Sequence, residues 1–116
     1  MDKQRNQRNL PTTVDDAYAM TGAQRIDFSN VPEDKRAFIS AIYDMTVIVE
    51  AANNHWKADW DDFEQPKYHP YILKIEGMTT YEYTVPFRSF ICRDEETAKY
   101  VGSQFFDLWD IIIKGK

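Results

Sequence analysis

The sequence predicts an α+β fold with a short N-terminal helix, a long central helix, a three-stranded antiparallel sheet and a C-terminal helix. Three observations predict it. Apolar residues recur at three- and four-residue steps in two long stretches, which begin near Glu33 and Glu95. Between these stretches, residues 71–92 are rich in Tyr, Thr and Ile, as strands are. Gly, Pro and Asn mark the boundaries.

Composition limits the function classes. The chain has 116 residues, of which 43% are hydrophobic, and this favours one globular domain over disorder. A net charge of −5 disfavours broad nucleic-acid or membrane surfaces. The longest apolar run, 45–52, is interrupted by Thr46 and Glu50, so no membrane span is expected. One cysteine and a polar N-terminus without a signal-peptide core indicate a cytoplasmic protein.

The N-terminal third contains an arm and two helix starts. Residues 1–11 are polar and are expected to form a flexible arm, which leaves residues 12–116 as a single globular domain. Thr13 is expected to cap a short helix that stops at Gly22. Asn30 is expected to cap the long helix of residues 33–53, with Pro32 in its first turn.

The segment from Trp56 to Tyr71 connects this long helix to the sheet. Its Asp and Pro content excludes a regular helix or a central strand. Its five large aromatic rings are expected to be covered by the rest of the protein rather than left in water, so the segment is not a floppy linker. We interpret it first as a structural connector, and the alternative is a binding site.

The predicted sheet is an antiparallel meander. Residues 71–76 alternate in polarity, residues 76–77 form a turn, and residues 79–85 are a second strand. After the interruption at Pro86, residues 87–92 form the third strand. Asp94 then caps the last helix. Gly102 costs that helix roughly 1 kcal/mol relative to Ala, so close packing against the sheet or the long helix is expected there.

Two segments carry a family resemblance. They read Asn53-x-x-Trp56-Lys57-x-x-Trp60-x-Asp62 with Lys67-Tyr68-x-Pro70-Tyr71, and Glu95-Glu96-x-Ala98-x-Tyr100-x-Gly102-x-Gln104-Phe105-x-x-Leu108-Trp109. This pattern resembles a family of small proteins encoded by bacteriophages and prophages. The resemblance implies a host-cell cytoplasmic context and no particular reaction. His55 stands where relatives often carry Gly, His69 stands where they often carry Tyr, and Cys92 does not align with their cysteine.

The candidate function is therefore a non-enzymatic phage or prophage accessory role, exercised by binding a host or phage protein or a second copy of the chain. Trp and Tyr on a loop with acidic neighbours are typical of interface anchors. The candidate binding residues are Trp56, Asp59, Trp60, Asp61, Asp62, Tyr68 and Tyr71. We expect no cofactor and no catalytic residue.

Two alternatives stay open. Aromatic residues on an exposed sheet face could stack the bases of single-stranded nucleic acid, and the candidates are Tyr81, Tyr83, Phe87 and Phe90. The second alternative, a metal-assisted hydrolase, is less favoured than nucleic-acid binding. His55, His69 and the three Asp residues have ligand chemistry, but their spacing matches neither a zinc nor a calcium motif. Cys92 has no flanking nucleophile motif.

Overall fold

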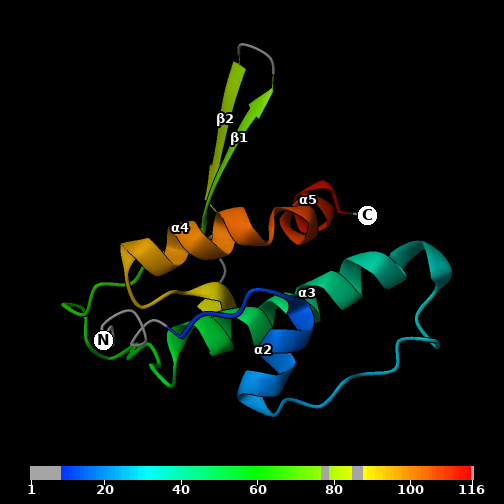
Figure 1. The fold of residues 1–116 in the computed structure, drawn as a ribbon, viewed down its shortest axis with the longest axis horizontal. Coiled ribbons are helices and arrows are strands. Elements are labelled where there is room, and N and C mark those ends of the chain that lie inside the picture. Colours follow the sequence, from blue (N-terminus) through cyan, green and yellow to red (C-terminus); the bar gives the residue numbers. More distant parts are fainter. Residues whose placement is uncertain (1–8, 77–78, 85–87, 116) are drawn as a thin grey trace.

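Helices dominate this protein. The computed structural model describes residues 9–76, 79–84 and 88–115 (Figure 1). Within these ranges lie four α-helices, a short 3₁₀ helix and a sheet of two antiparallel strands. The predicted α+β fold with a three-stranded sheet is therefore wrong, because the described part of the chain is mostly helical and carries only one hairpin.

The first helix, α2, spans Val14–Thr21 and confirms both of its predicted boundaries. The Thr13 hydroxyl accepts a hydrogen bond from the Asp16 N–H at 3.0 Å, and Gly22 has a φ of 73°. The Tyr18 hydroxyl donates to the Asp44 carboxylate at 2.6 Å, which ties α2 to the long helix. Of the predicted arm, residues 1–8 lie outside the described ranges, and Pro11 is fully buried.

The long helix, α3, spans Glu33–Asn53 as predicted, but its start differs from the expectation. Pro32 occupies the N-cap position and no side chain caps the helix, so the prediction that Asn30 caps it is wrong. A turn closed by the Val31 N–H and the Phe28 carbonyl places Asn30 before the helix start. Arg36 holds this turn by donating to the carbonyls of Phe28, Ser29 and Val31.

The hairpin consists of β1, Tyr71–Glu76, and β2, Thr79–Thr84. Tyr71 pairs with Thr84 at its base and Glu76 with Thr79 at its far end. The predicted turn at Gly77 and the interruption at Pro86 lie outside the described residues. Figure 1 shows the hairpin projecting away from the helices, with α4 at its base.

A 3₁₀ helix, Arg88–Phe90, stands in the middle of the predicted third strand, residues 87–92. Phe90, Ile91 and Cys92 are buried in succession. A strand alternates its side chains between two faces, so a strand against one layer of helices could not bury three consecutive residues. Strand-like pairing survives only as an isolated bridge between Tyr68 and Cys92.

The predicted C-terminal helix is two helices, α4 (Glu95–Gln104) and α5 (Phe106–Lys114), which meet at Phe105. Asp94 caps α4 as predicted, accepting from the Thr97 N–H at 2.8 Å. Trp109, in α5, is fully buried in the core. Its indole N–H donates to the Val101 carbonyl at 3.0 Å. Its ring packs edge-on against the Phe90 ring, with 5.3 Å between the ring centroids.

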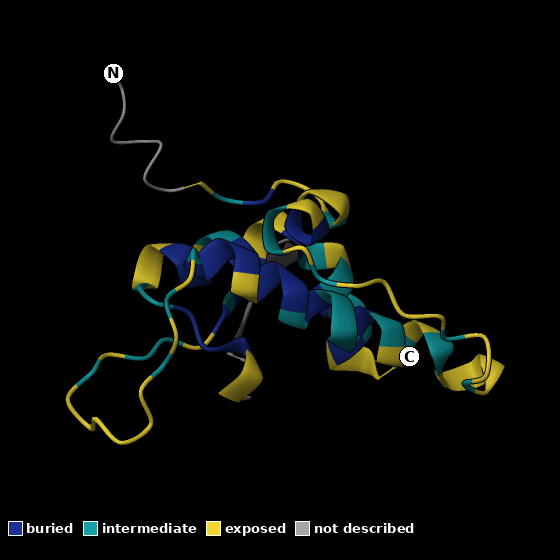
Figure 2. Cartoon of the chain, turned by 90° about the horizontal axis from the view of Figure 1, so that it is seen from below, coloured by how far each residue is buried: buried dark blue, intermediate teal, exposed yellow. Residues whose placement is uncertain are grey.

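Helix α3 is the centre of the molecule. It packs against α2, α4, α5 and the 3₁₀ helix, and in Figure 2 the buried residues follow its middle and C-terminal part. The largest fully buried apolar side chains come from several elements: Met45, Ile48, Ile72, Phe90, Val101 and Trp109. The Trp56–Tyr71 segment leaves this core at the C-terminal end of α3 and returns to it at β1.

Candidate functional site

The Trp56–Tyr71 segment is attached to the core at both ends. At its start, Asn54 and His55 both have positive φ, 48° and 74°, and they turn the chain away from α3. At its end, Pro70 is fully buried. Tyr68 exchanges two backbone hydrogen bonds with Cys92, at 3.2 and 2.8 Å. The segment is therefore a connector held at both ends.

The middle of the segment, residues 59–64, is exposed at every position, and we call it the tip (Figure 2). Hydrogen bonds within the loop fold it. The Asp59 carboxylate accepts from the Asp61 N–H at 3.0 Å, and the Asp62 carboxylate accepts from the Glu64 N–H at 3.0 Å. The Gln65 side chain accepts from the Asp59 N–H at 2.7 Å. Asp59 and Asp62 thus shape the loop through side-chain-to-backbone turns.

Two cations contact the ring of Trp60, which is part of the tip. The Arg88 guanidinium lies 4.6 Å from the centroid of the indole ring, and the Lys67 ammonium lies 5.3 Å from it. Lys67 also donates to the Asp62 carbonyl at 2.9 Å. Cation–π contacts of this kind are worth about 0.5–1 kcal/mol each at exposed sites. Trp60 is 42% exposed, so its ring is positioned but not covered.

Phe63 is the functional candidate that sequence reasoning missed. It is 95% exposed, although the rings of this segment were expected to be covered. Its neighbours Asp61, Asp62 and Glu64 carry negative charge, and all three are exposed. The available signal was local: an isolated aromatic residue between acidic ones, in a stretch with no periodic pattern that would bury it.

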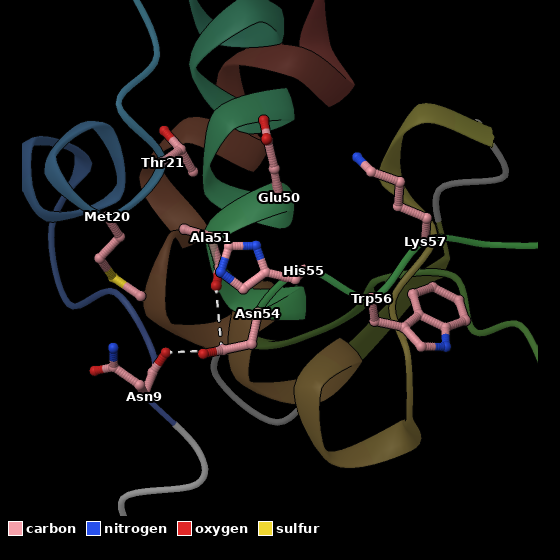
Figure 3. A pocket seen from close by; sticks show the side chains of 9 residues that line it. All are labelled: Asn9, Met20, Thr21, Glu50, Ala51, Asn54, His55, Trp56 and Lys57. Carbon is pink, nitrogen blue, oxygen red and sulfur yellow. Dashed lines mark hydrogen bonds between the residues drawn. The ribbon is translucent and has the colours of Figure 1, made fainter.

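Trp56 is half-buried and lines two hollows at the end of α3. One is a groove of about 380 Å³ between α3 and the loop, which Trp60, Arg88 and Asn53 also line. The other is a pocket of about 200 Å³ around His55 (Figure 3). There the Asn54 amide donates to the Asn9 carbonyl at 3.0 Å, and the Trp56 indole points away from His55.

Tyr68 and Tyr71 lie elsewhere. They line a separate hollow of about 480 Å³ on α4, together with Glu95 and Lys99. The seven predicted binding residues therefore divide into three places. Trp56 and Trp60 line the groove, Asp59, Asp61 and Asp62 lie with Trp60 on the tip, and Tyr68 and Tyr71 lie at the base of β1.

The residues considered for metal or nucleophilic chemistry do not form a site. Among the described residues, no three His, Cys, Asp or Glu side chains are grouped so that they could hold a metal ion. Cys92 is fully buried, and burial, followed by the nearby Asp94 charge, raises the pKa of its thiol to about 12. The thiol is therefore protonated at neutral pH and cannot act as a nucleophile.

The aromatic sheet face considered for nucleic acid is not assembled from the residues that can be placed. Phe90 is buried against Trp109. The side chains of Tyr81 and Tyr83, and the whole of Phe87, lie outside the described part. In residues 9–76, 79–84 and 88–115, no helix is long and apolar enough to cross a membrane.

Comparison with known proteins returns no relative: no protein-family model, curated protein or solved structure matches this chain.

Proposed function

We propose that this protein is a non-enzymatic accessory protein of the phage or prophage kind, and that it binds another protein through its tip. The phage context follows from the resemblance of residues 53–71 and 95–109. The binding role rests on one observation, which is that Phe63 is 95% exposed on a loop that its own hydrogen bonds hold in shape.

The fold of the loop supports this role. Aromatic residues, Phe among them, are enriched in protein interfaces, and a connector between α3 and β1 could be made without an exposed Phe. Because the Asp59 and Asp62 turns already order the backbone, a partner would lose little conformational entropy on binding it. Trp60, which contacts Arg88 and Lys67, is a second exposed ring on the tip.

The charge of the tip defines the partner. Asp59, Asp61, Asp62 and Glu64 surround Phe63 along the chain, and all are exposed. The complementary surface is an apolar pocket with a rim of Lys or Arg. Binding should therefore weaken as the salt concentration rises, because the rim contacts are exposed to solvent.

Site-specific photocrosslinking tests the proposal. A photoreactive phenylalanine analogue is placed at Phe63 or, as a control, at Ile26, which is 46% exposed on the loop after α2. Both proteins are irradiated in bacterial host lysate, and adducts specific to position 63 are identified and purified. Phe63→Ala should then weaken binding to the purified partner at least about tenfold, and Ile26→Ala should leave it unchanged. Equal adducts at both positions, or unchanged binding by Phe63→Ala, would refute the tip as the binding site.

The phage context has a separate test. The genes on either side of this one should encode phage replication or virion proteins, and a purely bacterial metabolic neighbourhood would contradict it.

A further inference from the structure

The groove between α3 and the loop is an apolar hollow that opens beside the tip. It holds about 380 Å³ and is lined by the C-terminal end of α3, the start of the Trp56–Tyr71 segment and the 3₁₀ helix. Its lining includes Val49 and Ile91, which are buried, and the indoles of Trp56 and Trp60. An apolar side chain can therefore find contacts in it.

Two cationic side chains, Lys57 and Arg88, also line this groove, and both are exposed. Among the Lys and Arg side chains that the structure describes, these two alone form neither a hydrogen bond nor an ion pair with an oxygen of the protein. The Arg88 guanidinium contacts the Trp60 ring, which offers it no oxygen. The others donate to carbonyls or pair with carboxylates: Arg25, Lys35, Arg36, Lys67, Arg93, Lys99 and Lys114. The groove therefore offers two unpaired positive charges in a chain of net charge −5.

Nearby carboxylates limit the ligands that suit the groove. Glu50 lines it, and Asp59 lies on the tip, one residue before Trp60. These groups repel a ligand with many negative charges, such as a nucleic acid. A single carboxylate suits the two cations, because a guanidinium binds a carboxylate through two parallel hydrogen bonds. The groove volume is near the lower end of the range for small-ligand sites, about 300–1,000 Å³, so the apolar part of the ligand is about one residue in size.

We propose that this groove binds the C-terminal residue of a partner protein. The apolar side chain of that residue packs against Trp56, and its terminal carboxylate pairs with Arg88 and Lys57. A chain end carries one carboxylate and one side chain on the same residue, and the chain need not continue past the groove toward Glu50 or the tip. An internal Asp or Glu needs a neighbouring residue to supply the apolar group and a chain that leaves in both directions.

The groove lining does not include Phe63, so this site and the tip are separate surfaces. Their ligands also differ, since the groove takes a chain end and the tip enters a pocket of its partner. Each proposal can therefore fail without the other.

Matched peptides test the site. Acetylated peptides Gly-Ser-Gly-Phe and Gly-Ser-Gly-Leu are prepared with either a free C-terminal carboxylate or a C-terminal amide. Each is titrated into the isotope-labelled full chain, and NMR follows the indole N–H signals of Trp56 and Trp60, with the buried Trp109 as an internal reference. At least one carboxylate peptide should bind about tenfold more tightly than its amide. It should shift the Trp56 signal and leave the Trp109 signal in place.

Three substitutions locate the carboxylate. Arg88→Gln should reduce the preference for the carboxylate to about twofold or less. Lys57→Gln should weaken binding of the carboxylate peptide about two- to threefold, and it removes no contact within the described protein. Lys99→Gln removes an exposed cation on α4 outside the groove and should leave the preference unchanged. Circular dichroism confirms that the variants are folded.

Carboxylate and amide peptides that bind equally overturn the proposal, as do peptides that fail to bind at millimolar concentration. So does an amidated peptide with an internal Asp, acetyl-Gly-Phe-Asp-Gly, that binds as tightly as the carboxylate peptides. A single-stranded oligonucleotide that binds more tightly than the peptides has the same consequence. Phe63→Ala should leave peptide binding unchanged, and a loss of binding would place the peptide on the tip instead of in the groove.

Discussion

The backbone of Gly102 in α4 lies directly against the main-chain carbonyl of Tyr71 in β1. A Cβ atom at position 102 would stand 1.9 Å from the Tyr71 oxygen and 2.7 Å from its carbonyl carbon. Both distances are far below van der Waals contact, and the obstacle is backbone rather than a flexible side chain. Glycine at this position therefore sets how closely the hairpin approaches the helix.

Gly102→Ala should destabilise the protein by about 2 kcal/mol or more, although Ala favours helix by about 1 kcal/mol, because α4 and β1 must move apart. Chemical denaturation measures the change in unfolding free energy. Ser103→Ala, on the exposed side of the same helix, should be neutral or slightly stabilising. Equal effects of the two substitutions would contradict the close approach.

Asn53 joins the end of α3 to the segment before α4. Its buried amide donates to the Ile91 carbonyl at 2.9 Å and accepts from the Arg93 N–H at 3.0 Å. Asn53→Ala should lower the unfolding free energy by about 2–3 kcal/mol, because both backbone groups lose their partner. Thr46→Ala, which removes only a hydroxyl bonded to its own helix at Tyr43, should change it by less than about 0.5 kcal/mol.

His55 has a φ of 74°, in the left-handed region that glycine adopts without steric cost. His55→Gly should raise the unfolding free energy by about 0.5–1 kcal/mol, because relief of strain exceeds the entropy gained by the unfolded chain. A thermal melt should show a midpoint higher by a few degrees. Lys57→Gly, nearby on the same exposed segment, should lower the midpoint instead. A lower midpoint for both variants would show that the His55 side chain contributes more than its backbone costs.

The two helix starts predict that Thr13 and Asn30 differ in their contribution to the unfolding free energy. Thr13→Ala should lower the unfolding free energy by about 1 kcal/mol, because the Asp16 N–H loses its acceptor. Asn30→Ala should cost almost nothing, since Pro32 occupies the N-cap of α3. Urea denaturation of the two variants side by side decides this, and a larger loss for Asn30→Ala would mean that Asn30 supports the helix start after all.

Cys92 should be almost inert in the folded protein. Burial restricts access to the sulfur. It also raises the pKa of the thiol from 9.0 to about 12, so a smaller fraction of the thiol is ionised at pH 8. A reagent that releases a coloured product when it reacts with a thiol should modify Cys92 at least roughly a hundredfold more slowly in the folded protein than in the denatured protein. The absorbance of the released product measures both rates. The same raised pKa means that Cys92 favours the folded state below pH 9.0 and loses this contribution as pH rises toward about 12. Rapid modification in native buffer would contradict the buried position.

Local signals in the sequence were sufficient for most helix boundaries. The cap at Thr13, the stop at Gly22, the extent of α3 and the cap at Asp94 depend on residues within a few positions of one another. The β1–β2 hairpin was predicted for the same reason, since alternation and turn residues act over short distances. Close packing at Gly102 could also be predicted, because glycine destabilises a helix unless it serves such a purpose. The identity of its partner, Tyr71, could not be predicted from the sequence.

What the sequence determined by itself was this set of local elements and a net charge of −5. The tertiary structure decided the rest. Burial of Phe90, Ile91 and Cys92 in succession replaced a third strand with a 3₁₀ helix, and the fit of Trp109 against Val101 and Phe90 came with a break in the last helix at Phe105. It also decided that two cations contact the Trp60 ring and that Phe63 faces water. These outcomes depend on surfaces brought together from distant parts of the chain, and the competition among residues for one core cannot be read from local periodicity.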